Sequence, residues 1–161
     1  MGAVTVNTER RVIQEEVVVP LSAPRTFGLF TDGVDSWWPR PYTWSGDALV
    51  AMVLEPEPNG RCLEVGPDGF QCHWGRVLEC DAPSRLRFSW QIGPHREPVP
   101  DRSQASEVEV RFQPEGEGAT RVSLEHRGFE RHGPLGEAYR DALASERGWP
   151  YLLREFVAAA S

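Results

Sequence analysis

The sequence predicts an α+β fold in which a curved antiparallel sheet wraps around a C-terminal helix. The C-terminal segment carries apolar residues at three- and four-residue spacing, which places them along one side of a helix. These residues are Leu135, Tyr139, Ala142 or Leu143, Trp149, Leu153, Phe156 and Val157. Upstream of them, short segments with one apolar face each follow one another on short turns. A sheet that curves around the helix is the economical way to cover its apolar side.

About seven strands are expected, because β-branched or alternating apolar residues mark that many segments between turn residues. They span 11–19, 48–56, 61–65, 70–79, 85–92, 107–113 and 120–126. In one of them, Leu86, Phe88 and Trp90 alternate with polar residues and are expected to face inward. Because short turns join the consecutive strands, the sheet is expected to be an antiparallel meander.

Helices are expected near both ends of the chain. Ser22 and Pro24 favour a short helix after the first strand, since serine caps helix N-termini and proline suits the first turn. This helix is expected to end near Thr31. Gly148 and Pro150 interrupt the C-terminal helical pattern. Because proline removes one helical hydrogen bond, either the helix kinks there or a second helix starts with Pro150 near its first turn.

Two segments lack both the helical and the strand period. The first, 34–47, is rich in aromatic rings, which belong to Trp37, Trp38, Tyr42 and Trp44. Such a loop must bury its rings or expose an apolar patch, so we expect a lid over one end of the core, a ligand-contacting loop, or both. The second, 93–104, is rich in proline and charge, and is expected to be a long loop or a mobile flap.

The strand at 61–65 and the one after it form the clearest hairpin, with Asp68 and Gly69 in its turn. A turn of either two or four residues would place Glu64 and His73 on one face, where they could be cross-strand neighbours. The opposite face is the more apolar one. We therefore expect the face that carries Glu64 to meet solvent.

Length and charge limit the choice of function. The 161 residues are expected to form one domain, 1–161, with a loose polar lead at 1–10. The composition of 40% hydrophobic and 25% charged residues is ordinary for a globular protein. A net charge of -7 argues against nucleic acid or an anionic membrane as a partner, because either would need a clustered basic surface.

The cysteines and the N-terminus are typical of a protein in a reducing compartment. Cys62, Cys72 and Cys80 are odd in number and show no metal-binding spacing, so we expect packing residues, no metal site and no cofactor. The N-terminus lacks the apolar core of a signal peptide, and no apolar run approaches the roughly 18 residues of a membrane span. The cytoplasm is the expected location.

Three strings, in order along the chain, resemble one known family. They are PLSAPRTFGLF at 20–30 with WWP at 37–39, GRVLECDAPSRLRFSW at 75–90, and GWP at 148–150 with LL at 152–153. They are similar to the activator-of-heat-shock-ATPase-homologue branch of the START-like (SRPBCC, Bet v 1-like) superfamily. The resemblance covers nearly the whole chain, from Arg11 to Ala159.

The resemblance implies a helix-grip fold. In that fold, six or seven antiparallel strands grip a long C-terminal helix, and short helices after the first strand close the mouth of an apolar cavity. It does not imply one activity, since members range from lipid and hormone binders through polyketide cyclases to co-chaperone domains.

Aromatic residues are the strongest binding signal. Our first hypothesis is that a small hydrophobic or aromatic molecule binds between sheet and helix, with Trp38 and Tyr42 at the mouth and His126 as the polar contact. The expected ligand-binding residues are Trp38, Tyr42, Trp74, Phe88, Trp90, Phe112, His126, Trp149 and Leu153. The alternative is that these rings fill the core and leave no cavity.

Two other functions stay open. A polyketide cyclase or hydrolase-like enzyme would need His126 or Glu64 inside the cavity, although the chain contains none of the common catalytic motifs and we expect no catalytic residue. A module that interacts with a chaperone ATPase is the other alternative, and the sequence also leaves a homodimer open.

Overall fold

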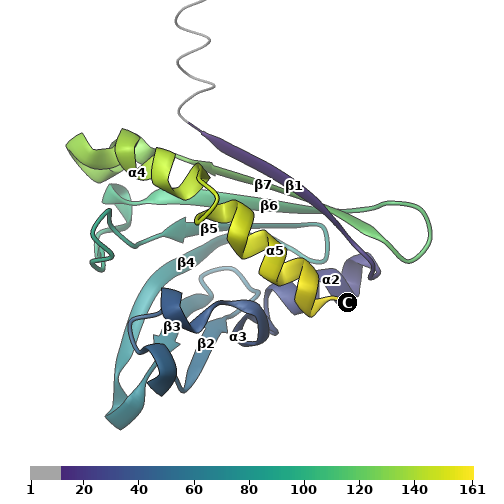
Figure 1. The fold of residues 1–161 in the computed structure, drawn as a ribbon, viewed down its shortest axis with the longest axis horizontal. Coiled ribbons are helices and arrows are strands. Elements are labelled where there is room, and N and C mark those ends of the chain that lie inside the picture. The colour runs from purple at the N-terminus through teal and green to yellow at the C-terminus, as the bar shows by residue number, and fades with distance from the viewer. Residues whose placement is uncertain (1–11) are drawn as a thin grey trace, which may run out of the picture.

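The computed structural model describes residues 12–161, so the lead predicted at 1–10 lies outside the described residues. Within them, seven strands form an antiparallel sheet in the order β1-β7-β6-β5-β4-β3-β2. The strands are β1 (Ile13–Val19), β2 (Ala51–Leu54), β3 (Arg61–Val65), β4 (Gln71–Asp81), β5 (Arg85–Trp90), β6 (Ser106–Pro114) and β7 (Thr120–Arg127). The sheet curves, and helix α5 (Trp149–Ala159) crosses its concave side (Figure 1). This confirms the predicted α+β helix-grip fold.

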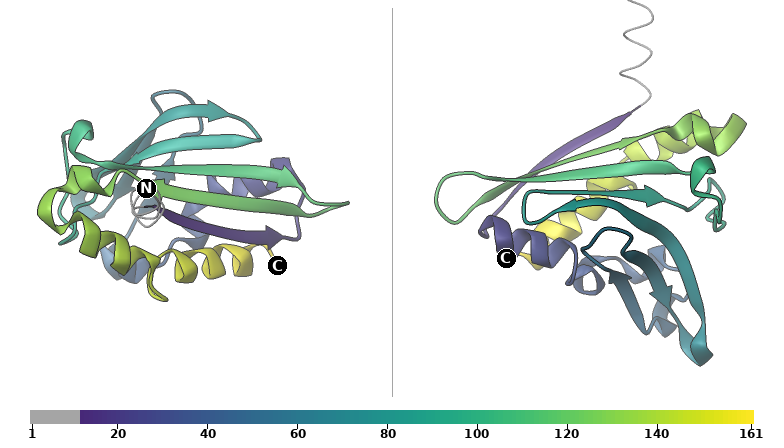
Figure 2. Two further views of the ribbon diagram at one scale, coloured as in Figure 1. Left: turned by 90° about the horizontal axis from the view of Figure 1, so that it is seen from above. Right: turned by 180° about the vertical axis from the view of Figure 1, so that it is seen from behind.

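Strands β2 to β7 lie side by side in chain order, as the meander predicts. Strand β1 is the exception, because the helices α2 (Ala23–Phe30) and α3 (Val34–Trp37) carry the chain from β1 to β2 at the opposite edge. Strand β1 instead pairs with β7, with Ile13 opposite His126. The first strand therefore lies against the C-terminal helices, which cover one side of the sheet (Figure 2).

The concave face supplies the apolar surface that the helix needs. On β5, Leu86, Phe88 and Trp90 are all buried, as their alternation predicts. Phe156 of α5 is fully buried, and its ring lies 5.4 Å from the ring of Phe30 in α2 and 5.1 Å from that of Trp37 in α3. Burying a side chain of this size contributes roughly 1.5–3 kcal/mol. Phe156 thus joins α2, α3 and α5 over the sheet.

The helix after the first strand starts as predicted, since the hydroxyl of Ser22 accepts a hydrogen bond from the backbone N–H of Arg25 at 3.4 Å. The aromatic segment after it is more helical than predicted. It contains α3 and two 3₁₀ turns, Arg40–Tyr42 and Gly46–Ala48. Each of these is a single turn, which is too short to produce a periodic pattern in the sequence.

The C-terminal helical segment is two helices, α4 (Gly136–Ala144) and α5. The second of the two predicted alternatives is correct, because Pro150 lies in the first turn of α5. Gly148 is required at the break, since a Cβ atom there would lie 2.0 Å from the carbonyl oxygen of Leu143. A larger residue would push the end of α4 away from the start of α5.

The β3–β4 hairpin differs from the prediction in register. The residues between the paired positions Val65 and Gln71 number five, 66–70, so Glu64 pairs with Cys72 and not with His73. An odd loop length reverses which side chains share a face, and Glu64 is only 1% exposed while His73 is exposed. The predictions that Glu64 neighbours His73 and that Glu64 meets solvent are therefore wrong.

Phe156→Ala is expected to lower the free energy of unfolding by about 3–5 kcal/mol, because it leaves a cavity where three helices meet. Urea denaturation followed by circular dichroism measures this change. The matched control is Val50→Ala at a side chain that is 60% exposed, which should change stability by less than about 0.5 kcal/mol. A similar, small effect of both substitutions would show that Phe156 does not join the helices to the sheet.

Candidate functional site

Within residues 12–161, aromatic rings fill most of the space between sheet and helices, and a small pocket remains at one end. Its volume is about 20 Å³, close to what one water molecule or one hydroxyl group needs. The pocket is lined by Trp38, Tyr42, Trp44, Met52, Glu64, Trp74, Ile92 and Arg96. The deep cavity that the resemblance implies is therefore closed by the protein's own side chains.

Trp38 fills the centre of this space. Its ring stacks on the ring of Trp74, with 5.9 Å between the centroids and 17° between the planes. The rings of Trp90 and Trp149 lie 6.1 Å and 6.4 Å from that of Trp38. Because Trp38 follows α3 directly and belongs to neither the sheet nor α5, the filling of the space depends on where this loop is held.

Hydrogen bonds between two loops hold the pocket closed. The indole N–H of Trp44 donates to the carbonyl oxygen of Arg96 at 2.7 Å, and the guanidinium of Arg96 donates to the carbonyl oxygen of Thr43 at 3.2 Å. We call these contacts between Trp44, Arg96 and Thr43 the latch. Arg96 has a φ of 64°, a left-handed conformation that is unfavourable for residues other than glycine. The latch therefore holds a strained turn.

Tyr42 fixes the same aromatic loop to the C-terminal helices. Its hydroxyl donates to the carbonyl oxygen of Arg147 at 2.8 Å, and its ring lies 5.4 Å from that of Tyr151. Arg147 belongs to the break between α4 and α5. The loop is thus anchored at two places, by the latch and by Tyr42.

Glu64 is the acidic group of the pocket. Its carboxylate oxygens accept hydrogen bonds from the backbone N–H groups of Trp44 at 2.9 Å and Ser45 at 2.7 Å. A buried carboxylate needs such donors, and these bonds also orient the aromatic loop. Burial, together with the charge of Glu64, raises the pKa of the nearby Cys72 thiol. The raised pKa disfavours the thiolate, which is the form in which a cysteine acts as a nucleophile.

The indole N–H of Trp74 has no hydrogen-bond partner. Among residues 12–161, Trp74 Nε1 and Arg140 Nε are the buried side-chain polar atoms in this condition. By contrast, the indole N–H of Trp37 donates to the carbonyl oxygen of Leu29 at 3.0 Å, and that of Trp90 donates to the hydroxyl of Tyr139 at 2.7 Å. Burying a hydrogen-bond donor without a partner is energetically unfavourable. Trp74, which carries this donor, lines the pocket.

His126 is fully buried in a hydrogen-bonded chain. The indole N–H of Trp149 donates to His126 Nδ1 at 3.0 Å, so a neutral imidazole carries its proton on Nε2. That nitrogen lies 2.7 Å from the hydroxyl oxygen of Ser106, which also lies 2.8 Å from His132 Nε2. Both ring nitrogens of His126 are thus occupied within the core.

Burial lowers the pKa of His126 well below its ordinary value, and the neighbouring His132 lowers it further. Burial also lowers the pKa of His132, against the opposing effect of Glu97 and Glu130. Both imidazoles are therefore neutral near pH 7. His126 has no free nitrogen in this arrangement with which to act as a general base.

The structure separates the predicted site residues into two groups. Trp38, Tyr42 and Trp74 line the pocket. The others lie in the surrounding core and do not line it: Phe88, Trp90, Phe112, His126, Trp149 and Leu153.

Sequence reasoning missed Arg96, and it named Glu64 only for the enzyme alternative while it expected that side chain to meet solvent. The position of Glu64 depends on the hairpin register. Arg96 lies in the patternless loop and carries no signal in the sequence.

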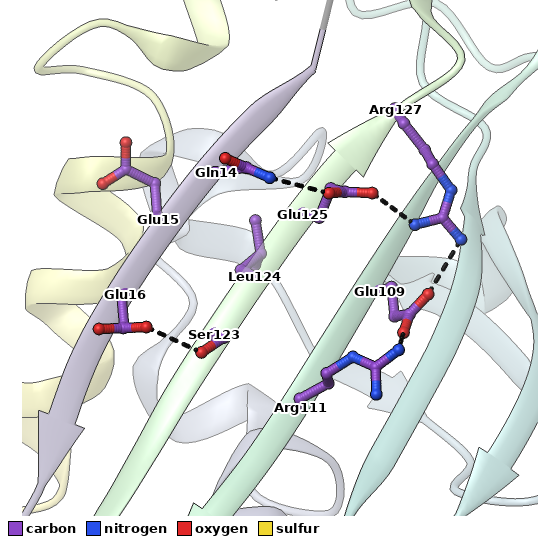
Figure 3. Close-up of a pocket in the computed structure, with 9 residues that line it drawn as sticks. All are labelled: Gln14, Glu15, Glu16, Glu109, Arg111, Ser123, Leu124, Glu125 and Arg127. Atoms are coloured by element: carbon purple, nitrogen blue, oxygen red, sulfur yellow. Dashed lines mark hydrogen bonds and ion pairs between the residues drawn. The ribbon is translucent and has the colours of Figure 1, made fainter. Parts of the chain in front are cut away.

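A second, open hollow of about 590 Å³ lies on the convex face of the sheet, over β1, β7 and β6 (Figure 3). Its central group is Glu109, which pairs with Arg85 at 2.9 Å, Arg111 at 2.6 Å and Arg127 at 3.0 Å. These arginines, Arg85 above all, lower the pKa of Glu109 to about 2. Because the charges neutralise one another, we assign this hollow to the ion pairs of the outer face and not to a binding site.

Two further observations concern the described part of the chain. None of its helices combines the length and the apolar character that crossing a membrane requires. Residues 12–161 also contain no group of three or more His, Cys, Asp or Glu side chains placed to share a metal ion.

Comparison with known proteins finds relatives over nearly the whole chain. The family model described as "Activator of Hsp90 ATPase homolog 1-like protein" matches residues 20–161. A search of curated proteins finds no match.

Several solved structures are similar to this chain. The anthrahydroquino-γ-pyrone synthase Txn09, complexed with SUM, is 36% identical with a TM-score of 0.66, over 92% of this chain and 96% of the synthase. The self-sacrificing resistance protein CalC from Micromonospora echinospora is 26% identical with a TM-score of 0.67, over 92% of this chain and 93% of CalC. A protein from Nitrosomonas europaea is 15% identical with a TM-score of 0.63, over 94% and 95% of the two chains, which shows the fold alone.

The free energy of unfolding is expected to fall as the pH drops below about 6.5. The folded-state pKa of His126 is depressed, so its neutral form stabilises the fold above 6.5, and this contribution is lost as the unfolded chain takes up protons at lower pH. The slope for His126 can reach about 1.4 kcal/mol per pH unit. Urea denaturation at pH 7 and pH 5 measures it.

His126→Gln should be less stable than the wild type at pH 7 but should show a shallower pH slope. His95→Gln, which removes an exposed imidazole, controls for the loss of a histidine as such. An unchanged slope in His126→Gln would contradict the assignment.

Proposed function

The chain belongs to the activator of Hsp90 ATPase homolog 1-like family, and from that premise we propose that it binds a planar aromatic molecule at the pocket beneath the latch. The observation that carries the proposal is the pocket itself, whose walls include the stacked rings of Trp38 and Trp74 and whose cover is held by hydrogen bonds between loops. The 36% identity to the anthrahydroquino-γ-pyrone synthase Txn09, whose structure is complexed with SUM, supports it.

A ligand larger than a few atoms must displace Trp38. A tryptophan side chain buries about 150–250 Å² of surface, which at about 25 cal/mol per Å² corresponds to roughly 4–6 kcal/mol. A ligand that takes its place between Trp74, Trp90 and Trp149 has to bury a comparable area. A molecule with two or more fused rings matches the indole that it replaces, whereas a single ring is smaller than that indole.

Opening the cover requires less free energy than unfolding a strand would. The latch consists of hydrogen bonds whose net contributions are about 0.5–1.5 kcal/mol each. Breaking them also relieves the left-handed conformation of Arg96. We propose that the closed form predominates and that the ligand selects the open one.

Catalysis is a second candidate, favoured by the identity to a synthase. An acid–base mechanism would need a free carboxylate or imidazole at the pocket. Both nitrogens of His126 are occupied in the core, and the carboxylate of Glu64 is 1% exposed and holds the backbone of Trp44 and Ser45 in place. We therefore propose binding without a chemical step. The cytoplasmic location, a chaperone ATPase partner and a homodimer stay predictions.

Anthraquinone is expected to quench the tryptophan fluorescence saturably, because its fused rings can replace the indole of Trp38. Decanoic acid, which is apolar but not planar, should bind more weakly. Trp38→Ala should be less stable by about 3–5 kcal/mol, yet should bind anthraquinone more tightly because no ring has to leave. Absence of saturable binding of anthraquinone to both the wild type and Trp38→Ala would refute the proposal.

Arg96→Ala is expected to raise the association rate of anthraquinone up to about tenfold, because it removes the guanidinium bond of the latch. Stopped-flow fluorescence measures this rate. Arg102→Ala removes an exposed arginine outside the pocket and should leave the rate unchanged. Equal rates for both variants and the wild type would show that the latch does not control access.

A further inference from the structure

Two of the residues that line the small pocket carry polar groups of opposite kind. The indole of Trp74 contributes an N–H that is buried without an acceptor. The carboxylate of Glu64 is 1% exposed and can accept hydrogen bonds beyond the two that it receives from Trp44 and Ser45, since each carboxylate oxygen has two lone pairs. The walls of the pocket thus include one residue with a free donor and one residue with spare acceptor capacity.

The size of the pocket limits which group can use both. A volume of about 20 Å³ admits about one non-hydrogen atom. A hydrocarbon edge would leave the N–H of Trp74 without a partner. A carbonyl or ether oxygen could accept from Trp74 but would face the carboxylate of Glu64 as a second acceptor. An ammonium group could donate to Glu64 but could not accept from Trp74.

We propose that the pocket is a subsite for a phenolic hydroxyl group. Its oxygen accepts a hydrogen bond from Trp74 Nε1, and its proton is donated to the carboxylate of Glu64. Because the ligand takes the place of Trp38, whose ring stacks on that of Trp74, the hydroxyl is one that is carried on an aromatic ring. This inference rests on the proposed function and names the chemistry by which the ligand is chosen, which makes Trp74 a specificity-determining residue.

Three matched probes test the inference: anthraquinone, 2-methoxyanthraquinone and 2-hydroxyanthraquinone. Their dissociation constants are measured by tryptophan fluorescence and checked by native mass spectrometry. The wild type is expected to bind the hydroxy compound about tenfold more tightly than either of the others, because only the hydroxyl satisfies both groups. Trp74→Phe keeps the ring but removes the donor, so its preference should fall to about twofold or less.

Glu64→Gln should also lower the preference, because the amide keeps one acceptor oxygen in place of two, and the backbone N–H groups of Trp44 and Ser45 compete for that oxygen. It provides a second variant in case Trp74→Phe folds poorly, and near-UV circular dichroism checks the fold of each. Trp37→Phe is the matched control, since it removes an indole N–H that already donates to Leu29 and does not line the pocket. It should keep the tenfold preference.

The possible results separate the two proposals. Wild-type binding of all three probes with equal affinity would overturn the hydroxyl subsite and leave the proposed function standing. A preference that persists in both Trp74→Phe and Glu64→Gln would likewise overturn it. Failure of all three probes to bind would overturn both proposals together.

Discussion

The packing of Trp38 against Trp74 is the contact on which the rest of the structure depends. A strongly curved sheet of seven strands leaves a concave volume that one helix of eleven residues does not fill. Close packing is required of a protein interior, so other side chains must occupy the remainder. Here the chain uses indole and phenyl rings, and it takes the central ring from a loop. The packing of the core therefore depends on the position of this loop.

Hydrogen bonds fix the orientation of several of these rings. Trp90 is held by Tyr139, and Trp149 is held by His126, whose other nitrogen is held by Ser106. Each bond restricts the rotamers of a large aromatic side chain. It also satisfies a polar atom whose burial without a partner would be unfavourable. Trp74 departs from this pattern. Among residues 12–161, Trp74 carries a fully buried indole N–H without a partner, and a local inconsistency of this kind is expected at a functional site.

The fold could be predicted because the patterns of apolar residues that specify its strands and helices are local and periodic. Alternation on β5 and the three- and four-residue spacing around Leu153 and Phe156 identify the faces that must meet. The candidate site was predictable only as far as its aromatic residues, since large rings are recognisable in any context. Glu64 could not be placed, because one residue more or less in a turn reverses a strand's faces. Arg96 could not be found, because its carbonyl oxygen and its guanidinium bind a distant loop, and no sequence pattern indicates that the two loops meet.

The bond from Tyr42 to the carbonyl oxygen of Arg147 has a mechanical consequence. Arg147 precedes Gly148, the point where the C-terminal helical segment is interrupted, so the cover of the pocket and the junction of two helices share one attachment. Releasing the cover would free that carbonyl and uncouple α4 from the aromatic loop. Binding of a ligand in the interior would then change the attachment of α4, a helix on the outside of the protein.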